Sequence, residues 1–173
     1  MGDIADAAGV TKPVLYQHWS SKRALYLELL EDVGAQLMDA ITTATAAVGS
    51  PRKRVEEGFG AYFGWVAANT SSFRLLFGSG ARRDDEFETV VRRVEQRMAD
   101  IVASLIDADI DEEHRHQLAF GIVGLAEGVS RSLVTGLEDD GEMPPGQPAF
   151  DAARLARRIA QLAWAGLRGI HRD

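Results

Sequence analysis

Apolar residues recur along most of the chain at steps of three and four, the spacing that puts them on one face of an α-helix. Alternation of apolar and polar residues, which is typical of strands, is rare. The pattern therefore predicts an all-α fold. The predicted helices cover residues 3–8, 11–18, 21–48, 52–68, 73–77, 84–105, 112–137 and 150–170.

Residues that start and stop helices lie between these stripes. Gly9 follows the first short helix and suits a tight turn, because glycine readily adopts the left-handed backbone conformation. Ser20 or Ser21 is expected to cap the long third helix, and Asp111 the helix that begins at 112. The acidic, Pro- and Gly-rich segment 138–148 is predicted to be a mobile loop.

The composition is that of a globular protein with one or two domains. The chain has 173 residues, of which 46% are hydrophobic and 26% charged. The absence of cysteine excludes disulfides and thiolate sites. No apolar run approaches the roughly 20 residues of a membrane span, and the first residues do not resemble a secretory signal. A cytoplasmic protein without membrane contact is therefore expected.

The net charge of −7 argues against general binding of polyanions, since affinity for nucleic acids depends largely on neutralising phosphates. The acidity is unevenly distributed, however. Residues 1–30 contain as many basic as acidic side chains, so the excess negative charge lies in residues 31–173. A small local nucleic-acid site near the N-terminus remains compatible with this distribution.

The first two short helices and the turn at Gly9 match a helix-turn-helix, whose second helix enters the major groove of DNA with its N-terminal residues foremost. Those residues are Thr11, Lys12 and Pro13. The Lys12 ammonium could reach a phosphate or a guanine edge. The alternative interpretation is a helical hairpin with a solvated polar face.

The run IADAAGVTKPVLYQHWSSKRAL, residues 4–25, closely resembles the helix-turn-helix signature of the TetR family of bacterial transcription regulators. The matching features are Ile-Ala-x-x-Ala-Gly-Val, then Leu-Tyr-x-His followed by an aromatic residue, and a lysine shortly after. The resemblance implies that Tyr16, His18 and Lys22 contact the DNA backbone. It further implies a DNA-binding domain with its connecting helix in residues 1–48, and a ligand-binding and dimerisation domain in 49–173.

The mechanism that the resemblance implies is that of a repressor. A homodimer places two recognition helices on two operator half-sites, and a small lipophilic effector favours a conformation that releases the DNA. Members of the family normally carry a further helix and turn before the matching segment. Without that cover, Ile4, Ala7, Val14, Leu15 and Trp19 are expected to be partly exposed. The alternative is a helical dimer that binds a small molecule but not DNA.

Aromatic residues concentrate in the middle of the chain and predict an apolar pocket there. Glu127 interrupts an apolar stripe and is a candidate polar contact to the ligand. An ion pair with Arg131, one helical turn further on, is the competing interpretation. For each aromatic residue, ordinary core packing is also an alternative. The predicted ligand-binding residues are Phe63, Trp65, Phe77, Phe87, Phe120 and Glu127.

The helix at 112–137 is apolar on two faces, which a single core does not explain. Its three glycines are unfavourable inside a helix but permit another helix to come close. Together with the last helix it could form a four-helix bundle across a two-fold axis. The predicted dimer residues are Leu118, Gly121, Ile122, Gly124, Leu125, Gly128, Val129, Ile159, Leu162, Ala163, Gly166 and Ile170.

Signals for catalysis are weak. Glu112 and His116 have a spacing compatible with a metal, but no third ligand accompanies them, and a solvated helix start explains them better. The sequence contains no G-x-S-x-G motif and no phosphate-binding loop. We therefore expect no metal, no cofactor and no enzymatic activity.

Overall fold

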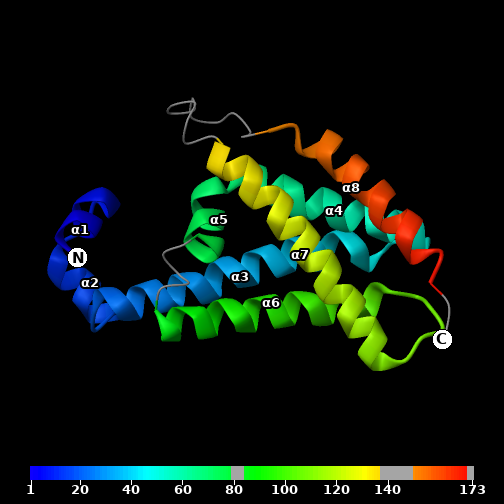
Figure 1. The fold of residues 1–173 in the computed structure, drawn as a ribbon. Coiled ribbons are helices and arrows are strands. Elements are labelled where there is room, and N and C mark those ends of the chain that lie inside the picture. Colours follow the sequence, from blue (N-terminus) through cyan, green and yellow to red (C-terminus); the bar gives the residue numbers. More distant parts are fainter. Residues whose placement is uncertain (79–83, 137–149, 171–173) are drawn as a thin grey trace.

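The structure is a computed structural model that describes residues 1–78, 84–136 and 150–170 (Figure 1). Every regular element in these residues is an α-helix, as the periodicity predicted. The predicted loop at 138–148 lies outside the described residues. The helices are α1 (Gly2–Ala8), α2 (Lys12–His18), α3 (Lys22–Ala46), α4 (Pro51–Ala68), α5 (Thr70–Phe77), α6 (Asp85–Leu105), α7 (Glu112–Gly136) and α8 (Ala152–Leu167).

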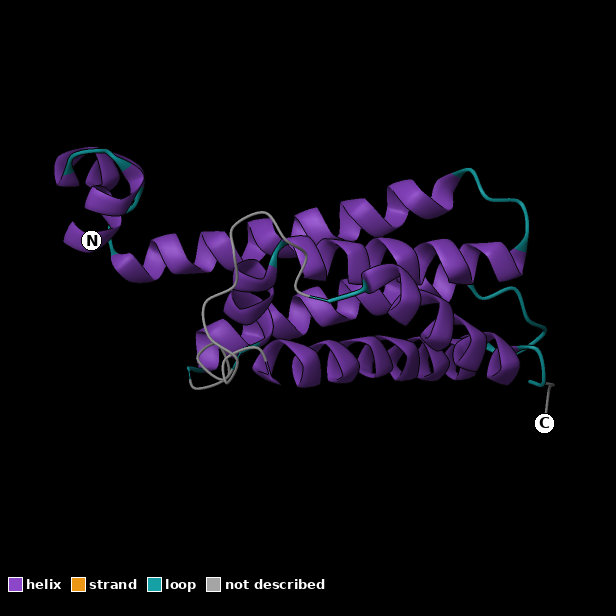
Figure 2. Cartoon of the chain, turned by 90° about the horizontal axis from the view of Figure 1, so that it is seen from above, coloured by secondary structure: helices purple, strands orange, loops and turns teal. Residues whose placement is uncertain are grey.

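The helices divide into a small head and a larger bundle. Helices α1 and α2 form the head, which projects from the bundle on the first part of α3 (Figure 2). In the bundle, α3 packs against α4 and α6, α6 against α7, and α4 against α8. The C-terminal end of the described chain lies at the opposite end of the molecule from the head (Figure 1).

Local sequence signals account for the helix boundaries. Gly9 has φ of 66° in the turn between α1 and α2, as predicted, and its N–H closes α1 by donating to the Asp6 carbonyl. Ser21 Oγ caps α3 by accepting from the Ala24 N–H at 3.0 Å. The predicted cap at the start of α7 is also confirmed, because Asp111 accepts from the His114 N–H at 2.8 Å.

The core is built around α3, whose buried side chains lie three or four residues apart as the stripe predicted. They are Leu30, Val33, Leu37 and Ile41. Gly34 allows the closest approach of α6, since a Cβ at this position would lie 2.6 Å from Val94 Cγ2. A glycine here therefore sets the distance between α3 and α6, a role that the sequence analysis did not detect.

The two apolar faces of α7 have different environments. One faces the core of the same chain and contains Ala119, Val123, Ala126, Ser130 and Val134, all buried. Phe120, which the sequence predicted as a ligand contact, is instead 42% exposed, because it lies one residue, or about 100° around the helix, from the buried Ala119. The other face, built from the stripe Leu118, Ile122, Leu125, Val129 and Leu133, is only partly buried.

Helix α8 is shorter than predicted at both ends. It begins at Ala152, after Asp151 accepts a hydrogen bond from the Arg154 N–H, and it ends at Leu167. Its small buried residues Ala156 and Ala160 lie against α4. The opposite side remains open to solvent, where Leu162 is 60% exposed.

An ion-pair cluster joins the start of α3 to the start of α6. Arg23 contacts Asp84 through Nη1 at 2.7 Å and Glu86 through Nη2 at 2.6 Å, and its guanidinium lies 4.8 Å from the centre of the Phe87 ring. Asp84 also caps α6, and Arg23 lowers the pKa of its carboxyl group. The beginning of α6 is thereby fastened to the helix that carries the head.

Candidate ligand cavity and DNA-contacting surface

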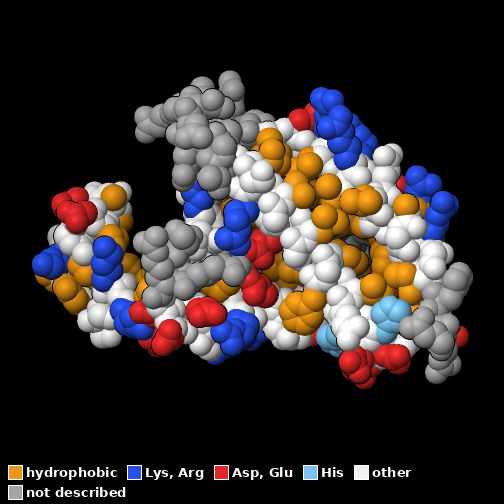
Figure 3. All heavy atoms as spheres, viewed as in Figure 1, with side chains coloured by type: hydrophobic (Ala, Val, Ile, Leu, Met, Phe, Trp, Pro, Cys, Tyr) orange, Lys and Arg blue, Asp and Glu red, His pale blue; other side chains and the backbone are white. Residues whose placement is uncertain are grey.

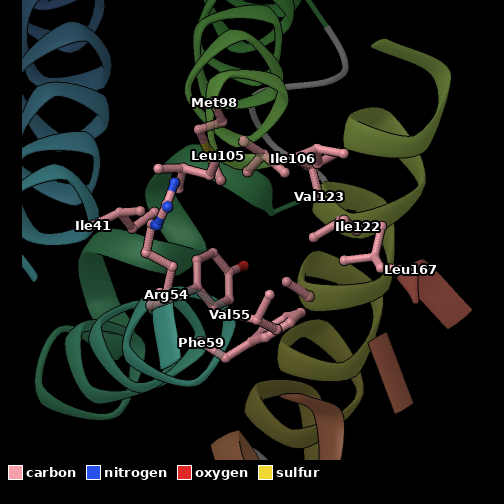
Figure 4. A pocket seen from close by; sticks show the side chains of 14 residues that line it. Ile41, Arg54, Val55, Phe59, Met98, Leu105, Ile106, Ile122, Val123 and Leu167 are labelled. Atoms are coloured by element: carbon pink, nitrogen blue, oxygen red, sulfur yellow. The ribbon is translucent and has the colours of Figure 1, made fainter. Parts of the chain in front are cut away.

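The bundle contains an apolar cavity in the half that lies away from the head (Figure 4). Its volume is about 80 Å³, counted as the space open to the centre of a water molecule, and it is partly open to solvent. Twelve of the fourteen lining residues carry no polar side-chain group. Those twelve are Ile41, Val55, Gly58, Phe59, Met98, Val102, Leu105, Ile106, Ile122, Val123, Ala126 and Leu167.

The two polar side chains in the lining are Arg54 and Tyr62, both on α4. Figure 4 shows Arg54 along the wall of the cavity, between Ile41 and Leu105. Its Nε is buried and has no hydrogen-bond partner among the described residues. A buried donor without a partner is unfavourable, so the cavity offers a ligand an unused hydrogen-bond donor.

Tyr62 presents a second unused polar group. It is 3% exposed, and its hydroxyl makes no hydrogen bond within the described residues. Ser130 on α7 is fully buried and close enough to interact with this hydroxyl, although the two groups do not form a hydrogen bond of ordinary geometry. Burial raises the pKa of the Tyr62 phenol well above its usual range.

We expect Tyr62→Phe to raise the free energy of unfolding by about 1 kcal/mol at pH 7, because it removes a buried hydroxyl that makes no well-formed hydrogen bond. The advantage should grow above about pH 10, where the phenol ionises in the unfolded chain but resists ionisation in the fold. Urea unfolding at pH 7 and at pH 10.5 measures both effects. The exposed Tyr16→Phe is the control, and a loss of stability in Tyr62→Phe would show that the hydroxyl has a partner.

Glu127 is 9% exposed and lies one position from the cavity residue Ala126. Its Oε1 accepts a hydrogen bond from Arg131 Nη2, the pairing along the helix that the sequence analysis held as the competing interpretation. It does not line the cavity. The ion pair accounts for a carboxylate at this buried position.

The predicted aromatic ligand contacts lie elsewhere than the cavity wall. Phe63 and Phe77 are core residues with exposures of 0% and 1%. Trp65 is partly buried against the core, and Phe87 lies beside Tyr26 at the junction of α3 and α6, with 4.5 Å between ring centres. Phe120 is exposed on α7. The lining is mostly aliphatic. In a sequence, such residues cannot be distinguished from those of an ordinary hydrophobic core.

The predicted DNA contacts are all exposed, on the head and at the start of α3. Thr11, Lys12 and Pro13 are exposed at the first turn of α2, and Lys22 is exposed at the first turn of α3. Tyr16 is 48% exposed. His18 is also exposed, at the end of α2.

The head packs loosely compared with the bundle. Leu15 is buried, but Val10 and Val14 are each 38% exposed. Trp19 fastens the end of α2 to α3 by donating from Nε1 to Glu28 Oε2 at 2.8 Å. Of the five residues that were expected to lack cover, Leu15 is the exception, because it faces the contact between the helices of the head.

The predicted dimer residues are exposed or partly buried in the single chain, and one of them, Ile122, also lines the cavity. Apolar side chains gather along α7 and α8 on the face seen in Figure 3. Gly121, Gly124 and Gly128 are exposed, and a Cβ at any of them would meet no atom of the described residues within 4 Å. Contacts among these parts of the chain therefore do not explain the three glycines.

His116 of α7 makes polar contacts near the surface. His116 Nε2 lies 3.2 Å from Asp100 Oδ1, and its Nδ1 lies 3.1 Å from the Glu112 carbonyl. Within the described parts of the chain, no three His, Cys, Asp or Glu side chains come together in a group that could hold a metal ion. Over the same residues, no helix combines the length and apolar character that crossing a membrane requires.

Two protein-family models match the chain, one at its N-terminal part and one over most of the remainder. The family described as "Bacterial regulatory proteins, tetR family" matches residues 1–29, and "Tetracyclin repressor-like, C-terminal domain" matches residues 51–166. The chain belongs to the TetR family. This TetR-family chain is 30% identical to the HTH-type transcriptional activator FasR of Mycolicibacterium smegmatis over 169 residues, which cover 96% of the chain and 73% of FasR.

Solved structures agree on the fold. A TetR-like transcriptional regulator from Rhodococcus sp. RHA1 superimposes with a TM-score of 0.72 at 23% identity, over 96% of this chain and 83% of the other. The ketosteroid transcriptional regulator KstR2 of Mycobacterium tuberculosis gives a TM-score of 0.62 at 18% identity, over 99% and 84%. The arrangement of helices is thus that of TetR-family regulators.

Proposed function

We propose that this TetR-family chain is a transcriptional regulator whose binding to operator DNA responds to a small molecule held in the cavity of the bundle. The observation that carries the proposal is a single helical framework with an exposed helix-turn-helix surface at one end and an internal apolar cavity in the other half. Membership of the family supports the same function.

DNA recognition is proposed for the head. Lys12 and Thr11 at the start of α2 would face base edges, while Tyr16, His18 and Lys22 would contact phosphates. The exposure of all these side chains supports this assignment. A dimer would place two copies of α2 on successive major grooves.

Lys22→Ala should weaken binding to all DNA sequences and reduce the slope of log affinity against log salt by about one unit, because one phosphate contact is lost. Lys12→Ala should also relax the choice of sequence. Sites selected from a random DNA pool and titrated by fluorescence anisotropy at several salt concentrations measure both effects. Lys53→Ala, which removes an exposed lysine of α4, is the control.

Failure to select any site would count against the regulator and in favour of a helical dimer that binds a small molecule alone. An unchanged salt slope in Lys22→Ala would remove that residue from the DNA contacts.

Dimerisation is proposed through the exposed faces of α7 and α8. The half-exposed stripe of α7, its three open glycines and the exposed Leu162 of α8 support a four-helix interface of two chains. Two equal copies of this surface would meet across a two-fold axis, which suits two operator half-sites.

The effector is proposed to be a lipophilic small molecule bound in the cavity. The apolar lining supports this class of ligand. The relative FasR is named an activator, whereas a repressor is the expectation from the sequence. Loss of DNA binding on addition of the effector is compatible with an activator and with a repressor, because the position of the operator decides the effect on transcription.

Helix α6 is proposed to couple the two sites. Its residues Met98, Val102 and Leu105 line the cavity, and its other end is held to α3 by the Arg23 cluster, about 20 Å away along the helix. A ligand that displaces α6 would therefore act on the start of α3, directly after the recognition helix.

Asp84→Asn should reduce the factor by which a ligand weakens DNA binding, and leave the affinity for ligand alone nearly unchanged. The reason is that Arg23 loses its charged partner at the N-cap of α6. Anisotropy titrations with and without ligand give the factor, and Arg92→Gln, which breaks an exposed pair with Glu88, is the control. An unchanged factor would exclude the cluster from the coupling.

A further inference from the structure

Arg54 brings a positive charge to the cavity, which an entirely apolar ligand does not explain. Its side chain lies in a wall made of aliphatic residues, among them Ile41, Met98 and Leu105 (Figure 4). Leaving a cation beside such a wall without an anionic partner is unfavourable. An alanine or leucine at this position would extend the apolar lining without that cost.

The neighbouring acids do not neutralise Arg54. Glu56, two residues on, is exposed and pairs with Arg52 at 3.1 Å. Glu57 is also exposed, and no ion pair of Arg54 with it or any other described residue occurs. Arg54 is half-buried with its Nε fully covered, so the guanidinium is held at the cavity with donors to spare.

We propose that the cavity takes an apolar molecule with an anionic group, and that Arg54 binds the anion. The proposal rests on the ligand cavity of the proposed function and specifies its chemistry. A carboxylate suits a guanidinium because the planar fork can donate two parallel hydrogen bonds. The apolar body would extend along α4 toward Tyr62, a rise of about 12 Å from Arg54.

The test uses three probes with the same eight-carbon chain, namely octanoate, 1-octanol and octylamine. Their affinities are measured by isothermal titration calorimetry at pH 7 for the full chain and its variants. We expect octanoate to bind at least about tenfold more tightly than octanol, because a hydrogen bond between charged groups strengthens binding by about tenfold or more. Octylamine should bind least, because its positive charge is repelled by Arg54.

Arg54→Met keeps an unbranched side chain of similar size without the charge. It should lower the affinity for octanoate by about 10- to 100-fold and leave that for octanol within about threefold. Lys53→Met removes the same charge from the adjacent exposed position and should change neither affinity. Arg54→Lys, which retains the charge, should keep part of the preference for octanoate over octanol. This variant replaces Arg54→Met in the test if Arg54→Met does not fold.

Ala126→Leu separates this proposal from the function on which it rests. It adds bulk inside the cavity and should weaken all probes. Equal binding of octanoate and octanol, both weakened by Ala126→Leu, would overturn the role of Arg54 and leave the cavity as the ligand site. Absence of binding by all three probes, or binding unaffected by Ala126→Leu, would overturn both.

Discussion

Phe63→Ala is expected to lower the free energy of unfolding by about 3–5 kcal/mol. The Phe63 side chain is fully buried, and its ring packs edge-on against Tyr62, with 5.2 Å between the centres, and stacks with Phe59. Removing the ring leaves a space in the core that the surrounding helices cannot fill. Since small domains are stable by only about 5–15 kcal/mol, the variant should lose much of its stability.

Chemical unfolding followed by circular dichroism measures this loss, at several protein concentrations so that dissociation of a dimer is separated from unfolding. Leu29→Ala, on the same bundle but 40% exposed, is the control and should cost below about 1 kcal/mol. A stable Phe63→Ala variant with altered ligand binding would return this residue to the ligand site that the sequence predicted.

Gly124→Leu is expected to weaken the dimer by about 100-fold or more. Within the described part of one chain, a Cβ at this position would meet nothing within 4 Å, and leucine is a better helix former than glycine. The folded single chain should therefore tolerate the change. At a two-fold interface the added bulk appears twice, and overpacking costs about 1–3 kcal/mol each time.

Sedimentation velocity over a range of concentrations measures the dissociation constant. The matched control is Gly64→Leu on α4, where a Cβ also meets nothing within 4 Å. If Gly124→Leu and Gly64→Leu sediment as the same dimer, α7 does not form the interface.

The helices and their ends could be predicted from sequence because their causes are local. The stripe of α3, the left-handed Gly9 and the caps Ser21 and Asp111 depend on residues within one or two helical turns. The family signature likewise lies within one continuous run of the chain. Short-range patterns of this kind survive in any packing of the helices.

The cavity could not be predicted in the same way, because it depends on how several helices cross. Tyr62 lines the cavity while the adjacent Phe63 fills the core, and both are aromatic residues on one helix. Phe120, predicted as a ligand contact, is exposed, although it lies only one position along α7 from the buried Ala119. Arg54 lies in a run of exposed charges in the sequence, and only the tertiary structure brings it beside Ile41 and Leu105. A half-buried charge inside a polar run carries no local signal.

The most direct test of a ligand-responsive regulator is the thermodynamic linkage between its two sites. The affinity for a selected operator is measured with and without a saturating amount of the probe that binds most tightly, and the affinity for the probe with and without operator. Both should fall, by the same factor of roughly 5–150, because coupling between binding sites is reciprocal. Specific operator binding that is indifferent to a ligand bound in the cavity would contradict the account.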